Sequence, residues 1–329
     1  MARHHGLQRR PLGARSGIEV TRIGIGLWPV PGGDWGPGND ADILEAIEAA
    51  LDGGVNFFDT ADVYGSGRSE ELLGRAMHGR RDNFVVATKI GWVGFDHTAF
   101  RSQYDTVEKL VLGVEQSLQR LDTDYVDLIQ CHIHNDEPNT DVFIEGFRRL
   151  KDEGKALTWG VSTGELAHVE RFNAEGDCDA LQIDYSILNR IPETEVLPYC
   201  LENGIGVIVR GPLAMGLLTD KFSANDTFPE GDFRRDWIED PTENEQFLAD
   251  LETVARLREV VPDGDSMAQF ALRFTMAHPA VTTVIPGARN RRQAESNTES
   301  GHRPELSPTE MRAVGSVVPA GGGRKIWPA

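Results

Sequence analysis

From about residue 42 onward, short runs rich in β-branched and aromatic residues alternate with longer stretches of helical periodicity. Such alternation is typical of parallel strands joined by crossover helices. Eight strand–helix units close most simply into a (β/α)8 TIM barrel, which commonly uses 250 residues or more as a single domain. The eight strands are predicted at residues 24–28, 55–61, 84–91, 126–132, 156–163, 180–186, 206–212 and 281–288.

The segments between the strands have the periodicity of amphipathic helices and end in or near glycine. Residues 42–54, for example, place Ile43, Ile47, Ala50 and Leu51 on one face. Further helices are predicted at 69–77 with Ser69 as the cap, at 106–121, 141–153, 165–173, 194–203, 244–261 and 265–277, from about Asn290, and at 307–317.

Residues 213–245 break this rhythm and are predicted to form a long loop after the seventh strand. We expect a flexible leader at 1–17, the barrel at 18–318 and a C-terminal tail at 319–329. The alternative architecture, an open doubly wound sheet, would place a glycine-rich phosphate turn after an early strand. Neither GxGxxG nor GxxxxGK[ST] occurs in the sequence, which favours the barrel.

Composition narrows the classes of partner. The formal net charge is −19, which disfavours nucleic acid and anionic membranes because both require a basic surface. No apolar run approaches the roughly 20 residues that span a bilayer, so a soluble protein is expected. Three widely spaced cysteines, Cys131, Cys178 and Cys200, argue against a disulfide framework. The predicted location is the cytoplasm, and the sequence does not indicate an oligomeric state.

Polar residues gather at the predicted carboxyl ends of the strands, where a barrel of this kind builds its active site. Taken singly, each has an ordinary structural explanation, such as a rim ion pair or a packed ring. Together they predict one site, to which six residues contribute: Asp59, Tyr64, Lys89, His132, Ser162 and Gln182.

The first four of these residues suit proton transfer to a carbonyl oxygen. Free tyrosine is a weak acid, and an ammonium beside the phenol of Tyr64 favours the phenolate. We therefore expect Lys89 to lower the pKa of Tyr64, Asp59 to hold the ammonium, and His132 to orient the substrate oxygen. A hydride would have to come from a cofactor, because no side chain supplies one.

Seven ordered segments resemble the signature segments of the aldo-keto reductases across roughly residues 18–300. They read FFDTADVYG, ATKIG, DLIQCH, GVST, QIDYS, RGPLAMGLLTDKF and IPGA. The resemblance implies a barrel that binds an extended nicotinamide dinucleotide and reduces aldehydes or ketones, or runs the reverse reaction. It places the proton donor at Tyr64 and its partners at Lys89, Asp59 and His132.

The same resemblance assigns the cofactor site. Ser162 and Gln182 match positions that contact the carboxamide, and the segment 211–216 matches the pyrophosphate contacts. Arg289, with Arg291 and Arg292, makes the adenosine end basic, which favours NADP(H) over NAD(H) because guanidinium groups bind a 2′-phosphate. The cofactor contacts predicted in this way are Gly26, Leu27, Trp28, Asp59, Ser162, Gln182, Arg210, Gly211, Pro212, Leu213, Gly216, Leu217, Lys221, Ile285, Gly287, Ala288, Arg289, Gln293 and Asn297.

Three positions depart from the family pattern. Arg210 stands where many members have a Tyr or Trp that stacks on nicotinamide. Thr163 replaces a common Asn beside Ser162, and Ser296 stands where Glu is frequent before Asn297.

Two other functions remain open from the sequence, and the substrate is undefined. CHIH at 131–134 with Asp59 is compatible with a metal-dependent hydrolase, although no metal is predicted because further ligands are lacking. A noncatalytic nicotinamide-binding regulator, like the potassium-channel β subunits of the family, is the other alternative. Trp28, Trp92 and Trp237 suggest an apolar-walled pocket for a small carbonyl substrate.

Overall fold

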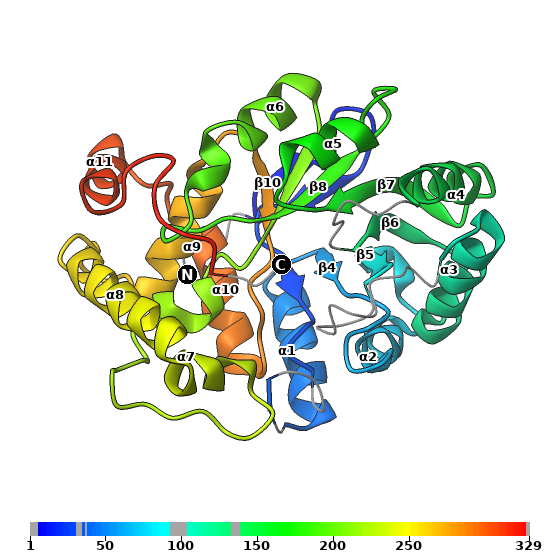
Figure 1. The fold of residues 1–329 in the computed structure, drawn as a ribbon. Coiled ribbons are helices and arrows are strands. Elements are labelled where there is room, and N and C mark those ends of the chain that lie inside the picture. The colour runs from blue at the N-terminus through cyan, green and yellow to red at the C-terminus, as the bar shows by residue number, and fades with distance from the viewer. Residues whose placement is uncertain (1–5, 31–34, 37, 93–103, 133–138, 327–329) are drawn as a thin grey trace.

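Eight parallel strands form the centre of the molecule in the computed structural model, with helices around them (Figure 1). The structure describes residues 6–30, 35–36, 38–92, 104–132 and 139–326. The strand order follows the sequence: β3 (Ile25–Gly26), β4 (Phe57–Asp59), β5 (Val85–Ile90), β6 (Val126–Cys131), β7 (Ala156–Ser162), β8 (Ala180–Asp184), β9 (Gly206–Arg210) and β10 (Val281–Val284).

The two edges of this sheet meet, so the strands close into a barrel. Parallel bridges join Ile23 to Val284 and Gly26 to Gly287, and the Gly24 amide donates to the Val284 carbonyl at 2.8 Å. Closure brings the carboxyl ends of all eight strands to one mouth. The predicted single-domain (β/α)8 architecture is therefore confirmed, and the predicted strands differ from the observed ones only at their ends.

Most helices form where the apolar periodicity predicts them. The predicted long loop at 213–245 is wrong in part, because it contains a 3-10 helix (Ala214–Thr219), α7 (Asp236–Glu239) and the start of α8 (Pro241–Arg258). In α3 (Val107–Leu121) the side chain of Thr106 accepts a hydrogen bond from the Lys109 amide, and the face that includes Leu110 and Val114 is buried. The other helices are α1 (Asp40–Asp52), α2 (Arg68–Met77), α4 (Thr140–Asp152), α5 (Leu166–Phe172), α6 (Val196–Asn203), α7 (Asp236–Glu239), α8 (Pro241–Arg258), α9 (Met267–Ala277), α10 (Arg291–His302) and α11 (Pro308–Val317).

One predicted cap is wrong. Helix α2 begins after Gly67, whose φ of 90° lies in the left-handed region, and no side chain caps it. The hydroxyl of Ser69 instead donates to the Leu27 carbonyl at 2.9 Å and accepts from Thr60 at 2.7 Å. Ser69 therefore connects α2 to the barrel wall and does not cap the start of the helix.

The N-terminal segment is a β-hairpin that closes the bottom of the barrel. Strands β1 (Arg9–Pro11) and β2 (Glu19–Thr21) pair antiparallel, and Leu12 between them is 0% exposed and packs into the interior cluster that contains Phe57. The prediction of a flexible leader is therefore wrong for residues 9–17. Arg-Arg-Pro has no strand pattern of its own, and the hairpin is held by the apolar contacts that it makes beneath the barrel.

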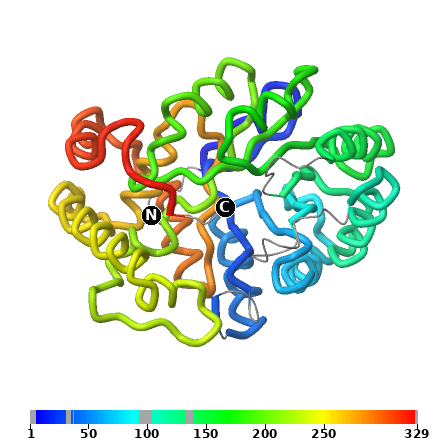
Figure 2. Tube along the Cα trace, viewed as in Figure 1, coloured from blue at the N-terminus to red at the C-terminus, as the bar shows by residue number. Residues whose placement is uncertain are grey.

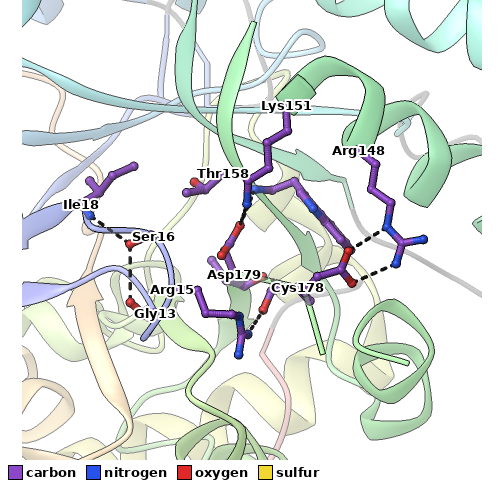
Figure 3. A network of polar contacts seen from close by, with 12 residues as sticks. Gly13, Arg15, Ser16, Ile18, Arg148, Lys151, Thr158, Cys178 and Asp179 are labelled. Atoms are coloured by element: carbon purple, nitrogen blue, oxygen red, sulfur yellow. Dashed lines mark hydrogen bonds and ion pairs between the residues drawn. The ribbon is translucent and has the colours of Figure 1, made fainter. Parts of the chain in front are cut away.

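Polar contacts attach this hairpin to the start of β8 (Figure 3). The guanidinium of Arg15 donates to the Cys178 carbonyl at 2.7 Å, and the Ala14 amide donates to the Gly204 carbonyl at 2.8 Å. Beside them Lys151 forms an ion pair with the buried Asp179 at 3.1 Å. The dark blue N-terminal segment accordingly lies against the green part of the barrel (Figure 2).

The segment after α11 returns to the barrel. In Figure 1 the red chain runs from α11 toward the ring of strands. The Arg190 amide donates to the Gly322 carbonyl at 2.9 Å, and the Arg324 amide donates to the Leu188 carbonyl at 2.8 Å. Arg324 also forms an ion pair with Asp250 in α8. Residues 319–326 therefore cover the loop that follows β8.

The hairpin generates a stability prediction. Leu12→Ala should lower the free energy of unfolding by about 2–4 kcal/mol, because it empties a buried site beneath the barrel. Leu112→Ala is the matched control: Leu112 is 54% exposed on α3, so its truncation should change stability by less than about 0.5 kcal/mol. Urea unfolding at constant pH measures both values. Equal effects of the two substitutions would contradict a hairpin that packs as described.

Candidate active site

A buried ion pair lies at the mouth of the barrel with a phenol beside it. The Lys89 ammonium donates to Asp59 Oδ1 at 2.6 Å, to the Thr60 carbonyl at 2.8 Å and to Tyr64 Oη at 3.1 Å. Lys89 is 0% exposed and Asp59 is 2% exposed. The structure therefore brings together three residues that the sequence places on two strands and a loop.

The alternation of side chains along a strand explains this arrangement. Residues two positions apart point to the same face, so a polar residue that follows an inward apolar residue by two also points inward. Four strands have this pattern, and their carboxyl ends thus place a polar layer above the apolar interior cluster. The inward apolar residues are Phe57, Ala87, Leu128 and Ala180, and their polar successors are Asp59, Lys89, Gln130 and Gln182.

Two amides of the polar layer complete the environment of the carboxylate. Gln182 Nε2 donates to Asp59 Oδ2 at 2.8 Å, and Gln130 Nε2 donates to the same oxygen at 3.3 Å. Both oxygens of Asp59 thus have hydrogen-bond donors. A buried carboxylate is tolerated only when it is paired and hydrogen-bonded in this way.

Burial and charge act against each other on Lys89 and Tyr64. Burial alone would lower the pKa of Lys89, but Asp59 and Tyr64 outweigh it through their charges and hydrogen bonds and raise this pKa above 10.5, so the ammonium stays charged. Burial raises the pKa of Tyr64 above 10.0, and the charge of Lys89 acts in the opposite direction. The expectation of a lowered pKa for Tyr64 is therefore wrong for the net shift, and Tyr64 is a neutral phenol at pH 7.

His132 lies next to Tyr64. Their ring centroids are 5.6 Å apart, and the ring of Trp92 lies 5.2 Å from that of His132 on another side. Burial, followed by the charges of Lys89 and Arg210, holds the pKa of His132 well below 6.5. The imidazole is therefore neutral at pH 7 and can hydrogen-bond an oxygen without carrying charge.

A cavity of about 660 Å³ opens above these residues and continues from β8 and β9 to the start of α10. Eighteen of the predicted site residues line it: Gly26, Trp28, Asp59, Tyr64, Trp92, His132, Gln182, Arg210, Gly211, Pro212, Leu213, Gly216, Lys221, Ile285, Gly287, Arg289, Gln293 and Asn297.

Six predicted residues lie behind the cavity wall. Lys89 acts through its contacts with Asp59 and Tyr64, and Trp237 packs against Phe247 with ring centroids 5.6 Å apart instead of facing the cavity. The prediction of Trp237 as a pocket residue is therefore wrong. The other four are buried near the cavity and do not line it: Leu27, Ser162, Leu217 and Ala288.

The cavity has features that fit an extended dinucleotide. His132 lines it, and its Nδ1 is buried with no hydrogen-bond partner among the described residues, so this atom can bind a polar ligand group. Ser162 Oγ, which lies behind the cavity wall, also has no partner among the described residues. At the opposite end Arg289, Arg292 and the first turn of α10 face the cavity, where backbone N–H groups and cations suit a phosphate.

Two aromatic lining residues were missed by the sequence analysis, and both belong to segments that meet over the cavity. Trp35 pairs with Asp232 through an antiparallel bridge, and its carbonyl accepts a hydrogen bond from Arg289 at 3.0 Å. Phe222 lies 5.5 Å from the guanidinium carbon of Arg234, which also lies 4.9 Å from the Trp35 ring. Contacts between two loops leave no periodic signal in the sequence.

Three further observations concern a metal site and a membrane span. Among the described residues, no group of three or more His, Cys, Asp and Glu side chains could hold a metal ion. His134 of the predicted HxH pair lies outside the described residues. No helix in the described part of the chain is long and apolar enough to cross a membrane.

Comparisons with known proteins agree with the geometry. A family model described as "Aldo/keto reductase family" matches residues 22–319. Aldo-keto reductase YhdN of Bacillus subtilis (strain 168) is 35% identical over 291 residues, which cover 87% of this chain and 86% of that protein. A probable voltage-gated potassium channel subunit beta of Oryza sativa subsp. japonica is 30% identical over 327 residues, covering 95% and 97%.

A solved structure extends the likeness to three dimensions. The glycerol dehydrogenase AKR11B4 from Gluconobacter oxydans superposes with a TM-score of 0.78 at 29% identity. The superposition covers 100% of this chain and 99% of that one.

The neutral buried imidazole generates a pH prediction. Because the pKa of His132 is below 6.5 in the folded state, its contribution to stability is complete above the unfolded-state value of about 6.5. This contribution is lost as the pH falls from there toward and through the folded-state value, because only the unfolded state takes up the proton. His132→Gln should therefore lose less stability between pH 6.5 and 5.5 than the unchanged protein, by up to about 1.4 kcal/mol. Urea unfolding at the two pH values measures this difference. An identical pH dependence in both proteins would contradict a neutral His132.

Proposed function

This chain belongs to the aldo-keto reductase family, and we propose that it interconverts a carbonyl compound and an alcohol by proton transfer at Tyr64. The observation that carries the proposal is the contact of Lys89 Nζ with Tyr64 Oη at 3.1 Å and with Asp59 at 2.6 Å. A bound nicotinamide dinucleotide supplies the hydride. The protein residues bind the substrate and move the proton.

Each residue has a separate role in this proposal. Tyr64 donates its proton to the carbonyl oxygen as negative charge develops there. Lys89 stabilises the resulting phenolate, which burial alone would make costly. Asp59 keeps the ammonium in place and charged, and neutral His132 hydrogen-bonds the substrate oxygen and orients it.

We assign the nicotinamide end to the part of the cavity beside Tyr64. Ser162 Oγ has no partner among the described residues, and Gln182 lines the cavity while its amide nitrogen donates to Asp59. Gln182 therefore has its amide oxygen left to accept from the carboxamide. Gly211 and the residues that follow it would adjoin the pyrophosphate.

We assign the adenosine end to the first turn of α10. Arg292 and Arg289 face the cavity there, and the Arg289 guanidinium also bonds the Trp35 carbonyl. Two cations beside helix N–H groups favour a 2′-phosphate, so we propose NADP(H) over NAD(H). Arg291 lies outside this group, because it forms an ion pair with Glu295 at 3.4 Å and does not line the cavity.

The proposed substrate is a small aldehyde or ketone with an apolar body. Trp28 and Trp92 line the cavity close to Tyr64, and aromatic walls of this kind exclude water and bind apolar groups. We propose a cytoplasmic location, since Cys131, Cys178 and Cys200 are all free and buried.

The channel relative supports a second candidate, a regulatory subunit that binds the cofactor with little turnover. Steady-state oxidation of NADPH over a panel of aldehydes, ketones and sugars distinguishes the two. Turnover with any member of the panel at rates typical of enzymes favours the reductase. Tight NADPH binding with no turnover favours the regulator.

Tyr64→Phe should lower kcat by about 10²–10⁴-fold, because it removes the proton donor and keeps the ring. NADPH affinity, measured by titration of protein fluorescence, should change little. Tyr125→Phe is the matched control: Tyr125 lies under Arg81, outside the cavity, and its substitution should leave kcat unchanged. Full activity of Tyr64→Phe would rule out the mechanism.

Arg292→Gln should weaken NADPH binding by about tenfold relative to NADH, because one cation facing the 2′-phosphate is removed. Arg291→Gln, at the neighbouring position outside the cavity, should leave the ratio of the two affinities within about twofold. Dissociation constants from isothermal titration provide the comparison. A wild-type protein that binds NADH more tightly than NADPH would contradict the proposed preference.

A further inference from the structure

Arg210 places a cation in the catalytic end of the cavity. It is the last residue of β9, lines the same cavity as Tyr64 and His132, and is partly buried there. Its charge lowers the pKa of Tyr64, which opposes the effect of burial on the phenol. It also lowers the pKa of His132, which adds to the effect of burial on the imidazole. A guanidinium therefore contributes positive potential to the space in which the carbonyl would be reduced.

One buried carboxylate faces this cation from the adjacent strand. Asp184 ends β8 directly opposite Arg210 in the strand register, and its charge raises the pKa of Arg210 against the effect of burial. Asn189 Nδ2 fixes this carboxylate by donating to Asp184 Oδ2 at 2.7 Å. Gly211 leaves room for it, since a Cβ at Gly211 would lie 2.4 Å from Asp184 Oδ1.

The two oxidation states of nicotinamide differ by one unit of charge at the ring. The oxidised ring is a cation, whereas the reduced ring is neutral. For hydride to reach a carbonyl held by Tyr64 and His132, the ring has to lie beside these residues, in the part of the cavity that Arg210 lines. Like charges in a site of low dielectric repel strongly, so the two states experience this guanidinium differently.

We propose that Arg210 makes the protein bind the reduced cofactor in preference to the oxidised one, and that Asp184 limits this preference. The inference rests on the proposed function, because it places the nicotinamide beside Tyr64. It has a consequence for the direction of reaction. Tighter binding of the reduced form raises the reduction potential of the bound couple, so the equilibrium on the enzyme moves toward carbonyl and reduced cofactor.

The quantity to measure is the dissociation constant of NADP⁺ divided by that of NADPH. Titration of the full-length chain with each nucleotide gives both constants, with quenching of protein fluorescence as the readout, since Trp28 and Trp92 line the cavity. Arg210→Gln removes the charge at similar length and should lower this ratio by about five- to tenfold. Arg210→Lys keeps the charge and should keep the ratio within about threefold of the wild type.

Asp184→Asn tests the same proposal by removing the negative charge beside Arg210 instead of the positive charge. It keeps the shape of the side chain and an oxygen for Asn189, removes the negative charge, and should raise the ratio by about three- to tenfold. This variant also keeps the test decisive if Arg210→Gln does not fold.

Two results would overturn the inference, and they have different meanings. An unchanged ratio in Arg210→Gln and Asp184→Asn, with both nucleotides still bound, overturns the role of Arg210 and leaves the proposed function intact. Failure of the wild-type protein to bind either nucleotide overturns the proposed function and the inference with it.

Discussion

The buried ion pair between Lys89 and Asp59 is the interaction on which the site depends. Removing two charges from water costs several kcal/mol per ion, and only close contact with satisfied hydrogen bonds offsets that cost. Here the 2.6 Å contact is supplemented by the Thr60 carbonyl and by the amides of Gln130 and Gln182. These groups come from β4, β5, β6 and β8 and the loop after β4, so the pair is stable only when the barrel is assembled.

The same dependence explains why the apolar floor matters for chemistry. Asp59, Lys89, Gln130 and Gln182 each lie two positions beyond an interior apolar residue, so the packing below fixes the direction of these side chains. Leu12 contributes to this packing from the N-terminal hairpin, although it lies far from Tyr64 in the fold. The positions of the proposed catalytic residues therefore depend on contacts at the opposite end of the barrel.

Periodicity predicts those parts of the structure that local pattern determines. It predicts the eight strands, most helix boundaries within a few residues, Asp59 and Lys89 at the ends of neighbouring strands, and Gln182 within a third strand. Features that arise from contacts between distant segments were not predictable from it. The hairpin at 9–21 packs against the barrel floor, and Trp35 is held at the cavity by contacts with distant residues such as Asp232 and Arg289.

Predictions made from residue type alone were wrong for side chains that can take either of two roles. Ser69 has the residue type of a helix cap, but the Leu27 carbonyl lies within 2.9 Å and its hydroxyl bonds there. Trp237 has the residue type of a pocket wall, but Phe247 and neighbouring rings enclose it. Lys89 was expected to lower the pKa of Tyr64, and its charge does act in that direction, but burial of the phenol has the larger effect.

The cavity and the rest of the molecule differ in charge: arginines line the cavity, whereas the protein as a whole is acidic. With a formal net charge of −19, the surface as a whole repels an anionic dinucleotide, and the arginines of the cavity have to overcome that repulsion locally. Solvent-exposed charges more than a Debye length apart, about 8 Å at physiological ionic strength, are largely screened, so arginines that line the cavity have the stronger effect on a ligand there. In the proposed binding mode, Arg289 and Arg292 at one end of the cavity would bind phosphate, whereas Arg210 at the other end would meet the nicotinamide. Cations at the two ends would then act on different parts of one ligand, and in our proposal the cation beside the reacting ring is the one that distinguishes its two oxidation states.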